Sequence, residues 1–338
     1  MNNALDFAVV IGVSHYNELS RLNGPSNDAT AFQNWLVSPD GGNLPPDNCK
    51  LILSQENSVR PLQDDIDDKF EEIVNKLLEE RNSARRLYFY FSGHGLGISH
   101  DDTALILPKW SNFWRNYALL SRAYLETLIH SGLFQEIFFF LDCCRNRRPG
   151  IQGANPRFGN ARPSNHSASC NFFVFYSTEF TTLSYEEAID VTLDDSKTKN
   201  QIHGLYTKAL LTGLNGNAAK NGSITVQSLQ QFIDSYLPEL LGERNLMQKA
   251  RLHSSGDSST PIVSLPVNTF PITIVFKTPG RKAILEDGYM NELKSGNTSE
   301  TPWNLSLRPG NYTILFDDAP EFKTIRITSS QNINHYEF

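Results

Sequence analysis

Short, uninterrupted runs of β-branched and aromatic residues alternate with longer amphipathic stretches over residues 1–252. A short apolar run bounded by turn residues is typical of a strand buried on both faces of a parallel sheet. Apolar positions three and four residues apart instead indicate a helix with one buried face. The pattern therefore predicts an α/β fold with a mostly parallel sheet between helices. Strands are expected at 7–12, 48–53, 86–91, 103–108, 137–141 and 172–177, and helices at 27–36, 66–78, 119–129, 206–214 and 224–240.

The pattern changes near residue 253. Residues 253–261 are almost entirely polar and predict a linker. Beyond them, short apolar runs are separated by turn signals, which is typical of a small β-sandwich. The sequence therefore predicts a first domain at 1–252, the linker at 253–261 and an all-β accessory domain at 262–338. Its six strands are expected at 270–276, 282–285, 303–307, 312–316, 322–327 and 333–338.

Two segments of the first domain lack an apolar period. Residues 145–169 hold five arginines and no acid, whereas residues 179–195 hold six acids and no lysine or arginine. Segments of this composition favour irregular structure. We predict a loop at each, and we expect the loop at 145–169 to be accessible to proteases.

Composition narrows the class of protein. The net charge of −7 argues against general nucleic-acid binding. No apolar run approaches the length of about 20 residues that a membrane-spanning helix needs, and the first residues lack the basic and apolar regions of a signal peptide. The cysteines have no spacing typical of a secreted disulfide framework, which favours a reducing compartment. We therefore expect a cytoplasmic protein. The cysteines are Cys49, Cys143, Cys144 and Cys170.

Reactive side chains follow two of the predicted strands. The strand at 86–91 is followed by Ser-Gly-His94-Gly, and the strand at 137–141 is followed by Asp-Cys-Cys144. Because ligands bind beyond the carboxyl ends of strands in open α/β sheets, we expect these groups to lie at one edge. An imidazole can take the proton of a thiol, and the thiolate is a strong nucleophile. The sequence therefore predicts thiol nucleophilic catalysis.

This arrangement resembles the caspase-like cysteine peptidases, in which one strand ends in His-Gly and a later strand ends in Asp-x-Cys. The separation from His94 to Cys144, 144 − 94 = 50 residues, is the spacing known for caspases. Further stretches are similar to the metacaspase and bacterial caspase-homologue branch, in the same order along the chain. They are Val-Val-Ile-Gly-Val-Ser at 9–14, Gly-Pro-Ser-Asn-Asp-Ala at 24–29, Ala-Leu-Ile-Leu-Pro at 104–108 and Gly-Leu-Tyr-Thr-Lys-Ala-Leu at 204–210.

The resemblance implies a cysteine endopeptidase and selects its nucleophile. In the family pattern Asp-x-Cys, the attacking residue is Cys144, and Cys143 is the intervening position. His94 is then the base. The backbone N–H groups of Gly95 and Cys144 are expected to stabilise the negatively charged oxygen of the attacked carbonyl. The chain departs from the family after the nucleophile, where Arg145 opens an Arg-Asn-Arg run in place of the usual His-Ser-Gly, so the wall beyond Cys144 is left open.

The resemblance also implies a specificity. By family position, Asp28 and Asp142 line the pocket for the residue before the cut, and two carboxylates there would favour a substrate arginine or lysine. The alternative is that Asp28 caps a helix and Asp142 anchors a strand end. Family position places Ser184 and Tyr185 in the substrate cleft as well.

The arginines of the 145–169 loop suggest activation by cleavage. An arginine-specific enzyme would cut itself at Arg157 or Arg162, or an upstream protease or regulator would act there. The alternatives are that the basic loop occupies its own acidic pocket until it is displaced, or that it is a solvated surface loop. Metacaspases often need calcium, and Asp101 and Asp102 lie where the family places some of the ligands. Because six to eight oxygens cannot be assembled from this sequence, we expect no cofactor and no metal.

We expect a protein substrate, no nucleic-acid or membrane partner, and a monomer. The resemblance further implies a role in regulated proteolysis, in bacterial stress or antiviral defence. Two other classes stay open. One is a catalytically silent caspase-like scaffold that binds a partner through the C-terminal domain. The other is a non-proteolytic redox enzyme that uses both Cys143 and Cys144.

Overall fold

The structure, a computed structural model, describes most of the chain. The described residues are 3–80, 83–147, 150–159, 170–180, 202–220, 222–242, 248–264, 269–287, 292–308, 310–317, 319–327 and 335–338.

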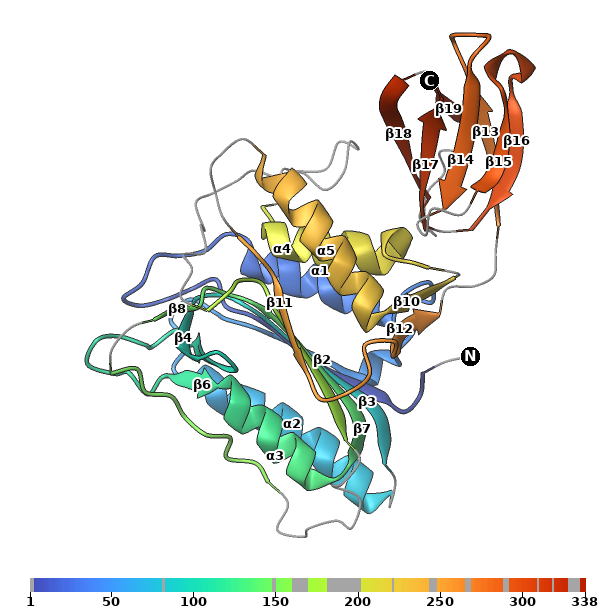
Figure 1. Cartoon of the computed structure of the whole chain (residues 1–338). Coiled ribbons are helices and arrows are strands. Elements are labelled where there is room, and N and C mark those ends of the chain that lie inside the picture. The colour runs from blue at the N-terminus through green and yellow to red at the C-terminus, as the bar shows by residue number, and fades with distance from the viewer. Residues whose placement is uncertain are drawn as a thin grey trace. The chain divides into compact units, whose positions relative to one another are not determined.

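A central sheet forms the body of the first part of the chain (Figure 1). In the described residues it has six strands in the order β11-β9-β7-β3-β1-β2. Five strands of this sheet run parallel to one another, namely β1, β2, β3, β7 and β9. The sixth strand, β11, pairs antiparallel with β9. The strands are β1 (Asp6–Gly12), β2 (Cys49–Leu53), β3 (Ala84–Ser92), β7 (Phe134–Asp142), β9 (Asn171–Tyr176) and β11 (Arg251–Ser254).

Helices cover both faces of this sheet, which is why its inner strands are apolar without alternation. In Figure 1, α1 lies on one face and α2 and α3 lie on the other. Phe32 of α1 stacks on Tyr90 at 4.5 Å between ring centroids, and Phe70 of α2 stacks on Phe89 at 5.9 Å. Within the described ranges, no helix is both long and apolar enough to cross a bilayer. The helices are α1 (Pro25–Val37), α2 (Leu62–Glu79), α3 (Ser121–Ser131), α4 (Leu205–Thr212) and α5 (Val226–Leu241), with short turns at Pro46–Asn48, Gly213–Asn217 and Thr298–Glu300.

A second, small sheet continues from the end of β3. Its order is β6-β5-β4-β8, and β8 runs parallel to β4, with Leu96 opposite Asn146. The chain that follows His94 and the chain that follows Cys144 are therefore hydrogen-bonded neighbours. The strands are β4 (Gly95–Ser99), β5 (Asp102–Ile106), β6 (Ala118–Leu120) and β8 (Asn146–Arg147).

The expectation of an accessible loop at 145–169 holds only in part for its described residues: 150–159 form no helix or strand and several of them are exposed, whereas the start of the segment and Phe158 are held in the fold. Residues 146 and 147 form β8, and Arg145 is 2% exposed. Further along, Phe158 is buried and stacks on Phe70 at 4.7 Å. One buried cation and one isolated aromatic residue produce no periodic signal, so the sequence pattern does not reveal them.

Helix α1 begins earlier than expected, and this changes the interpretation of Asp28. The helix starts at Pro25, and its N-cap position is Gly24, without a side-chain cap. Proline is favoured in the first turn because its missing N–H needs no partner there. Asp28 is therefore inside the first turn, and the alternative role as a helix cap is wrong.

The C-terminal residues form two sheets that share one core, as expected for a sandwich. One sheet has the order β16-β13-β19 and the other β15-β14-β17-β18. Trp303, Leu285 and Ile314 belong to their common buried cluster. The sequence analysis missed β15 because its polar residues lie on an exposed edge. The strands are β13 (Phe270–Val275), β14 (Lys282–Asp287), β15 (Glu292–Asn297), β16 (Trp303–Leu307), β17 (Gly310–Phe316), β18 (Ala319–Ile327) and β19 (His335–Glu337).

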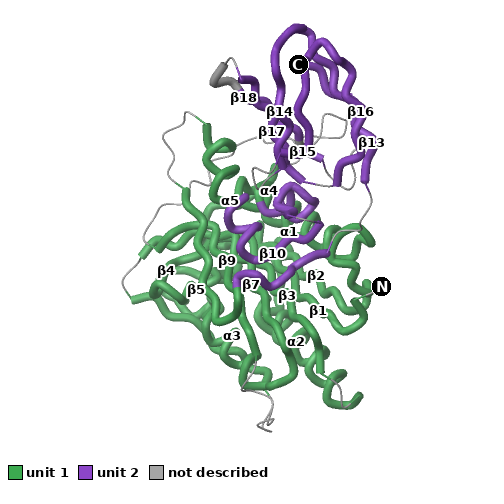
Figure 2. The backbone as a smooth tube through the Cα atoms, turned by 45° about the vertical axis from the view of Figure 1, so that its right-hand side comes forward, with its two compact units in different colours: residues 1–209, 233–257 green, residues 210–232, 258–338 purple. Residues whose placement is uncertain are grey.

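The chain divides into two compact units (Figure 2). One comprises 1–209 and 233–257, and the other comprises 210–232 and 258–338. The segment 253–261 contributes to strands at both ends, since β11 ends at Ser254 and β12 (Pro261–Ser264) pairs with β10 (Ser223–Thr225). A boundary between independently folding domains at 253–261 stays a prediction.

Candidate active site

The backbone register between β3 and β7 brings the predicted base and nucleophile to one place. Ser92 pairs with Asp142 in this register, and the N–H of Gly93 donates to the carbonyl of Asp142 at 3.2 Å. His94 and Cys144 each follow their paired residue by two positions. Both side chains therefore leave the carboxyl edge of the sheet from neighbouring strands, as the sequence predicts.

The surroundings of His94 favour one tautomer. Its Nε2 lies 2.9 Å from the backbone carbonyl of Ser20. A carbonyl only accepts, so Nε2 donates in this bond and the lone pair of the neutral ring is on Nδ1. Tyr16 holds the residue from the other side, because its hydroxyl accepts the His94 N–H at 2.7 Å and its ring lies 4.6 Å from the imidazole. Burial lowers the pKa of His94, which keeps the ring neutral and able to act as a base.

The two adjacent cysteines lie in different environments. Cys143 is 2% exposed and belongs to the central core, whereas Cys144 is half-buried. Ser177 fixes Cys143, since its hydroxyl accepts the Cys143 N–H at 3.1 Å and donates to the Cys143 carbonyl at 3.0 Å. A buried, anchored cysteine cannot meet a substrate. The arrangement therefore favours Cys144 as the reactive thiol, in agreement with the sequence analysis.

Gly95 lies directly against the cysteine pair. A Cβ atom at this position would be 2.6 Å from the Cys143 sulfur and 2.6 Å from the Cys144 carbonyl oxygen. Both distances are shorter than any stable contact, so only glycine lets the His94 strand end approach the Cys144 strand end this closely. The expected roles of the Gly95 and Cys144 N–H groups toward an oxyanion stay predictions.

Arg145 forms the wall that the sequence analysis left open. Its guanidinium lies 3.8 Å from the centroid of the Tyr176 ring. It also donates to the Thr103 hydroxyl at 3.0 Å and to the carbonyls of Ser99 and His100 at 3.0 and 2.6 Å. One buried side chain thus ties the residue after Cys144 to both β5 and β9.

Asp28 is buried beneath the site, with its carboxylate fully engaged. It is 1% exposed, and it accepts from His203 Nδ1 at 2.9 Å, from the Gly204 N–H at 3.1 Å and from the Ser92 hydroxyl at 3.2 Å. Burial raises the pKa of Asp28, and the bond to His203 opposes that shift. In this structure Asp28 organises its neighbours and does not itself face solvent.

Asp142 is the more accessible of the two carboxylates. It accepts from the Thr207 hydroxyl at 2.6 Å, and Thr207 in turn lies 2.5 Å from the Tyr90 hydroxyl. A Cβ atom at Gly204 would lie 2.6 Å from an Asp142 oxygen and 3.1 Å from an Asp28 oxygen, so the two carboxylates converge on Gly204. Burial and the charge of Asp28 raise the pKa of Asp142 to about 7.

The remaining predicted residues divide into two groups. Ser184, Tyr185 and Arg162 lie outside the described residues. Arg157 is described, and it forms an ion pair with Asp64 while its N–H donates to an Asp67 oxygen at 3.3 Å. Because Phe158, the next residue, is in the core, cleavage after Arg157 would first require that segment to detach.

Asp101 and Asp102 are occupied by protein groups. Asp101 pairs with Arg122 and accepts from the Ser99 hydroxyl, and Asp102 accepts from the Arg122 N–H at 3.1 Å. In the part of the chain that the structure describes, no three histidine, cysteine or acidic residues form a group suited to a metal ion. Calcium independence stays a prediction.

The sequence analysis missed residues that support the site from a distance in the chain. His203 and Thr207 bond to the two carboxylates, and Ser20 and Tyr16 hold His94. Of these four residues, only Thr207 belongs to a stretch with family resemblance, Gly-Leu-Tyr-Thr at 204–207. The other contacts depend on tertiary structure, for which one sequence carries no local signal.

Replacing Arg145 by Met should lower the free energy of unfolding of the full chain by about 2–4 kcal/mol, because buried carbonyls lose charge-assisted hydrogen bonds. Urea unfolding followed by tryptophan fluorescence measures this difference. The control is Arg147→Met on exposed β8, with an expected change within about 0.5 kcal/mol. Equal losses in the two variants would contradict the role of Arg145.

Comparison with known proteins agrees with this geometry. The family model described as Caspase domain matches residues 5–252. A probable protease from a Desulfuromonadales bacterium is 36% identical over 154 residues, which are 42% of this chain and 18% of that protein. The match thus spans less than a fifth of the length of this relative.

Solved structures show weaker likeness. Protein GSU0716 from Geobacter sulfurreducens has a TM-score of 0.48 at 12% identity, over 77% of this chain and 99% of that one. A structure described only as a protease has a TM-score of 0.36 at 11% identity, over 96% of this chain and 68% of that one. Neither TM-score reaches 0.5.

The family model extends from before β1 to β11 and includes the strand ends that hold His94 and Cys144. Its match and the mostly parallel central sheet confirm the predicted α/β fold class. The chain belongs to the caspase domain family of cysteine peptidases.

Proposed function

We propose that the chain is a metacaspase-type endopeptidase that uses a Cys144–His94 dyad and cleaves proteins after arginine or lysine. The observation that carries this proposal is the β3–β7 register, which pairs Ser92 with Asp142 and so delivers both side chains to one edge. The exposure of Cys144 and the burial of Cys143 support the choice of nucleophile.

The chemistry follows from the His94 tautomer. Nδ1 takes the proton of the Cys144 thiol, and the sulfur attacks the carbonyl carbon of the scissile bond. The oxyanion is held by the N–H groups of Gly95 and Cys144. His94 then gives its proton to the leaving amine, and the remaining thioester is hydrolysed by water. The Ser20 carbonyl stabilises the imidazolium that forms in between.

The convergence of two carboxylates supports specificity for a basic residue before the cut. In this proposal Asp142, which is less buried than Asp28, contacts the substrate guanidinium or ammonium directly. Asp28 adds negative charge from behind and accepts from the Gly204 N–H, and the lack of a side chain at Gly204 lets both carboxylates approach its backbone. A guanidinium in contact with a partly buried carboxylate is strongly favoured over a neutral group.

The burial of Cys143 speaks against the redox alternative, because dithiol chemistry needs both sulfurs to be accessible. The silent scaffold stays a second reading of the same fold. Activation by cleavage in 145–169, a monomeric state and a part in bacterial stress or antiviral defence belong to the proposal as the implications of the family resemblance.

Fluorogenic peptides ending in Arg, Lys or Asp test the dyad. Wild type should cleave after Arg, and Cys144→Ala should lose at least about 10³-fold of this activity. The matched control is Cys143→Ala, which should retain activity within about tenfold. Reactions run with and without calcium should agree.

Three outcomes would count against parts of this proposal. Loss of activity in both cysteine variants would favour paired thiol chemistry. Cleavage after Asp alone would keep the peptidase and remove the roles of Asp28 and Asp142. Absence of any cleavage, with partner binding unchanged in Cys144→Ala, would favour the scaffold.

The pKa of Asp142 predicts a pH dependence for arginine substrates. A carboxyl group with a raised pKa is neutral below it and ionised above it, so kcat/KM should fall as the pH drops through about 7. We do not expect His94 to cause this acid-side fall in kcat/KM, since burial lowers the pKa of His94. In Asp142→Asn, kcat/KM for Arg should drop about 10- to 100-fold, and the remaining acid limb should move to lower pH. If the acid limb of the kcat/KM profile stays at the same pH in Asp142→Asn, Asp142 is not the group that causes it.

Self-processing has its own readout. Active enzyme should be cut after Arg157 or Arg162, and Cys144→Ala should remain intact, as judged by intact mass. Because Phe158, the residue directly after Arg157, is buried against Phe70, we expect Arg162→Ala to remove more of the cut than Arg157→Ala. Intact wild type under conditions of peptide turnover would show that self-processing is wrong.

A further inference from the structure

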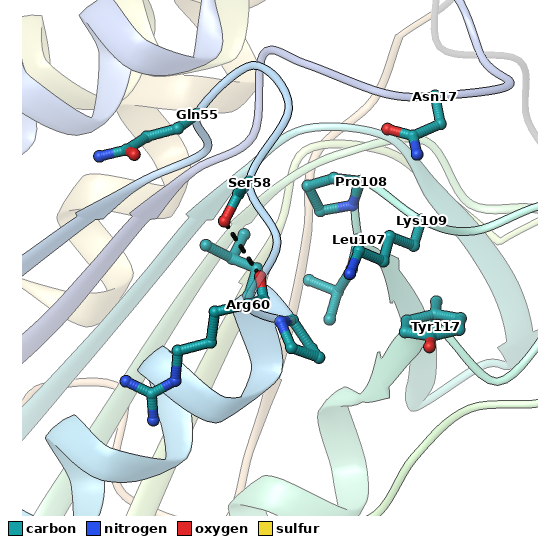
Figure 3. Close-up of a pocket in the computed structure, with 10 residues that line it drawn as sticks. Asn17, Gln55, Ser58, Arg60, Leu107, Pro108, Lys109 and Tyr117 are labelled. Carbon is teal, nitrogen blue, oxygen red and sulfur yellow. Dashed lines mark hydrogen bonds between the residues drawn. The ribbon is translucent and has the colours of Figure 1, made fainter.

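A pocket lies at the carboxyl ends of β1 and β2 (Figure 3). It is a shallow surface hollow, and its volume of about 370 Å³ includes the open solvent above it. Asn17 follows β1, Gln55 follows β2, and Lys109 and Tyr117 come from the connection between β5 and β6. The pocket belongs to none of the groups assigned above to nucleophile, base or acidic pair.

Its position relative to the dyad follows from the order of strands. Along the sheet edge, β7 carries Cys144, its neighbour β3 carries His94, and β1 and β2 come next. The histidine of such a dyad gives its proton to the leaving amine, so the segment after the scissile bond leaves on the histidine side. This direction leads from Cys144 past His94 to the pocket.

Backbone hydrogen bonds connect the pocket to His94 itself. The Ile106 N–H donates to the His94 carbonyl at 3.0 Å, and Leu107, the next residue, lines the pocket. Tyr16 bonds to the His94 N–H, and Asn17, the next residue, donates its own N–H to the Pro108 carbonyl at 2.9 Å. Hydrogen bonds thus tie the walls of the pocket to His94.

The acidic pair lies toward the other face of the sheet. Asp28 belongs to α1, whereas the pocket is bounded by Pro61 and Leu62 at the start of α2. A peptide whose basic residue meets Asp142 would pass the dyad and reach the α2 face at the pocket. The two sides of the scissile bond would then meet surfaces of different charge.

Lys109 sets the charge of the pocket. No acid lines it, and its two cations are Arg60 and Lys109. Arg60 already pairs with Asp65 and Asp68, and in Figure 3 its guanidinium points away along α2. Lys109 is half-buried and donates to the Val59 carbonyl at 2.7 Å. Among the described residues it has no carboxylate partner, so an acidic group entering the pocket would supply one.

The two loops that line the pocket also carry exposed apolar side chains. Val59 is 91% exposed, Phe113 95% and Trp114 62%. The ring of Trp114 packs edge-on against the lining residue Tyr117 at 6.3 Å. Exposed apolar side chains next to a pocket favour a surface that binds a partner.

We propose that this pocket and its apolar rim bind the substrate segment that follows the scissile bond, with an acidic residue against Lys109 and an apolar residue over Trp114. The inference rests on the proposed peptidase function and deepens it. The substrates are then proteins in which a basic residue at the cut is followed by acidic and apolar residues.

Internally quenched peptides test this preference. They share one arginine at the cut and carry Asp, Ala or Lys at the first, second or third position after it. Wild type should cleave the best Asp peptide about two- to fivefold faster than its Lys counterpart, which is the range expected of a partly exposed ion pair. Lys109→Met should abolish the ratio and Lys109→Glu should invert it. The control, Lys69→Glu on the exposed face of α2, should leave the ratio unchanged.

A second readout separates failure of the pocket from failure of the peptidase. An arginine peptide with a fluorescent amine as leaving group has no residues after the cut, so its turnover by wild type reports the peptidase alone. Binding of an acidic peptide to Cys144→Ala, followed by tryptophan emission, reports the pocket without catalysis. The emission change should be absent in Trp114→Phe and weakened in Lys109→Glu. Equal ratios in wild type and Lys109→Glu, or an emission change that survives both substitutions, would overturn the proposal.

Discussion

The site depends on the hydrogen-bonded register between β3 and β7. A parallel pair slipped by one residue would turn every side chain to the opposite face and separate His94 from Cys144. The register is held by apolar side chains that are buried on both faces of the sheet, such as Phe89 against Phe139 at 4.5 Å. The core thus determines how the strand ends that hold His94 and Cys144 are placed relative to each other.

Buried polar groups then join the loops that follow these strands. Arg145 lies under Tyr176 and bonds to two backbone carbonyls, and Ser177 fixes Cys143 by two reciprocal bonds. Burying a guanidinium is costly unless its donors are satisfied, so its surroundings are held in one arrangement. Cys144, the proposed nucleophile, therefore lies between neighbours that are both fixed by the fold.

Charge is distributed unequally across the catalytic edge. Asp28 and Asp142 converge near Gly204, and burial keeps their pKa values high, whereas Lys109 is on the far side of His94 without an acidic partner among the described residues. Opposite charges on the two sides of a cleavage site would select the direction as well as the identity of a bound peptide.

The sequence by itself determined the inner strands, the α/β class, the two reactive strand ends and the β-rich C-terminal region. Each of these depends on local periodicity or on residues adjacent in the chain, as with His94 and Gly95. Tertiary structure alone decided that Arg145 is buried, that Asp28 faces His203, that Phe158 anchors part of a predicted loop and that Lys109 lines a pocket. Such contacts join residues far apart in the chain, and an isolated side chain does not reveal whether its partner is water or another residue.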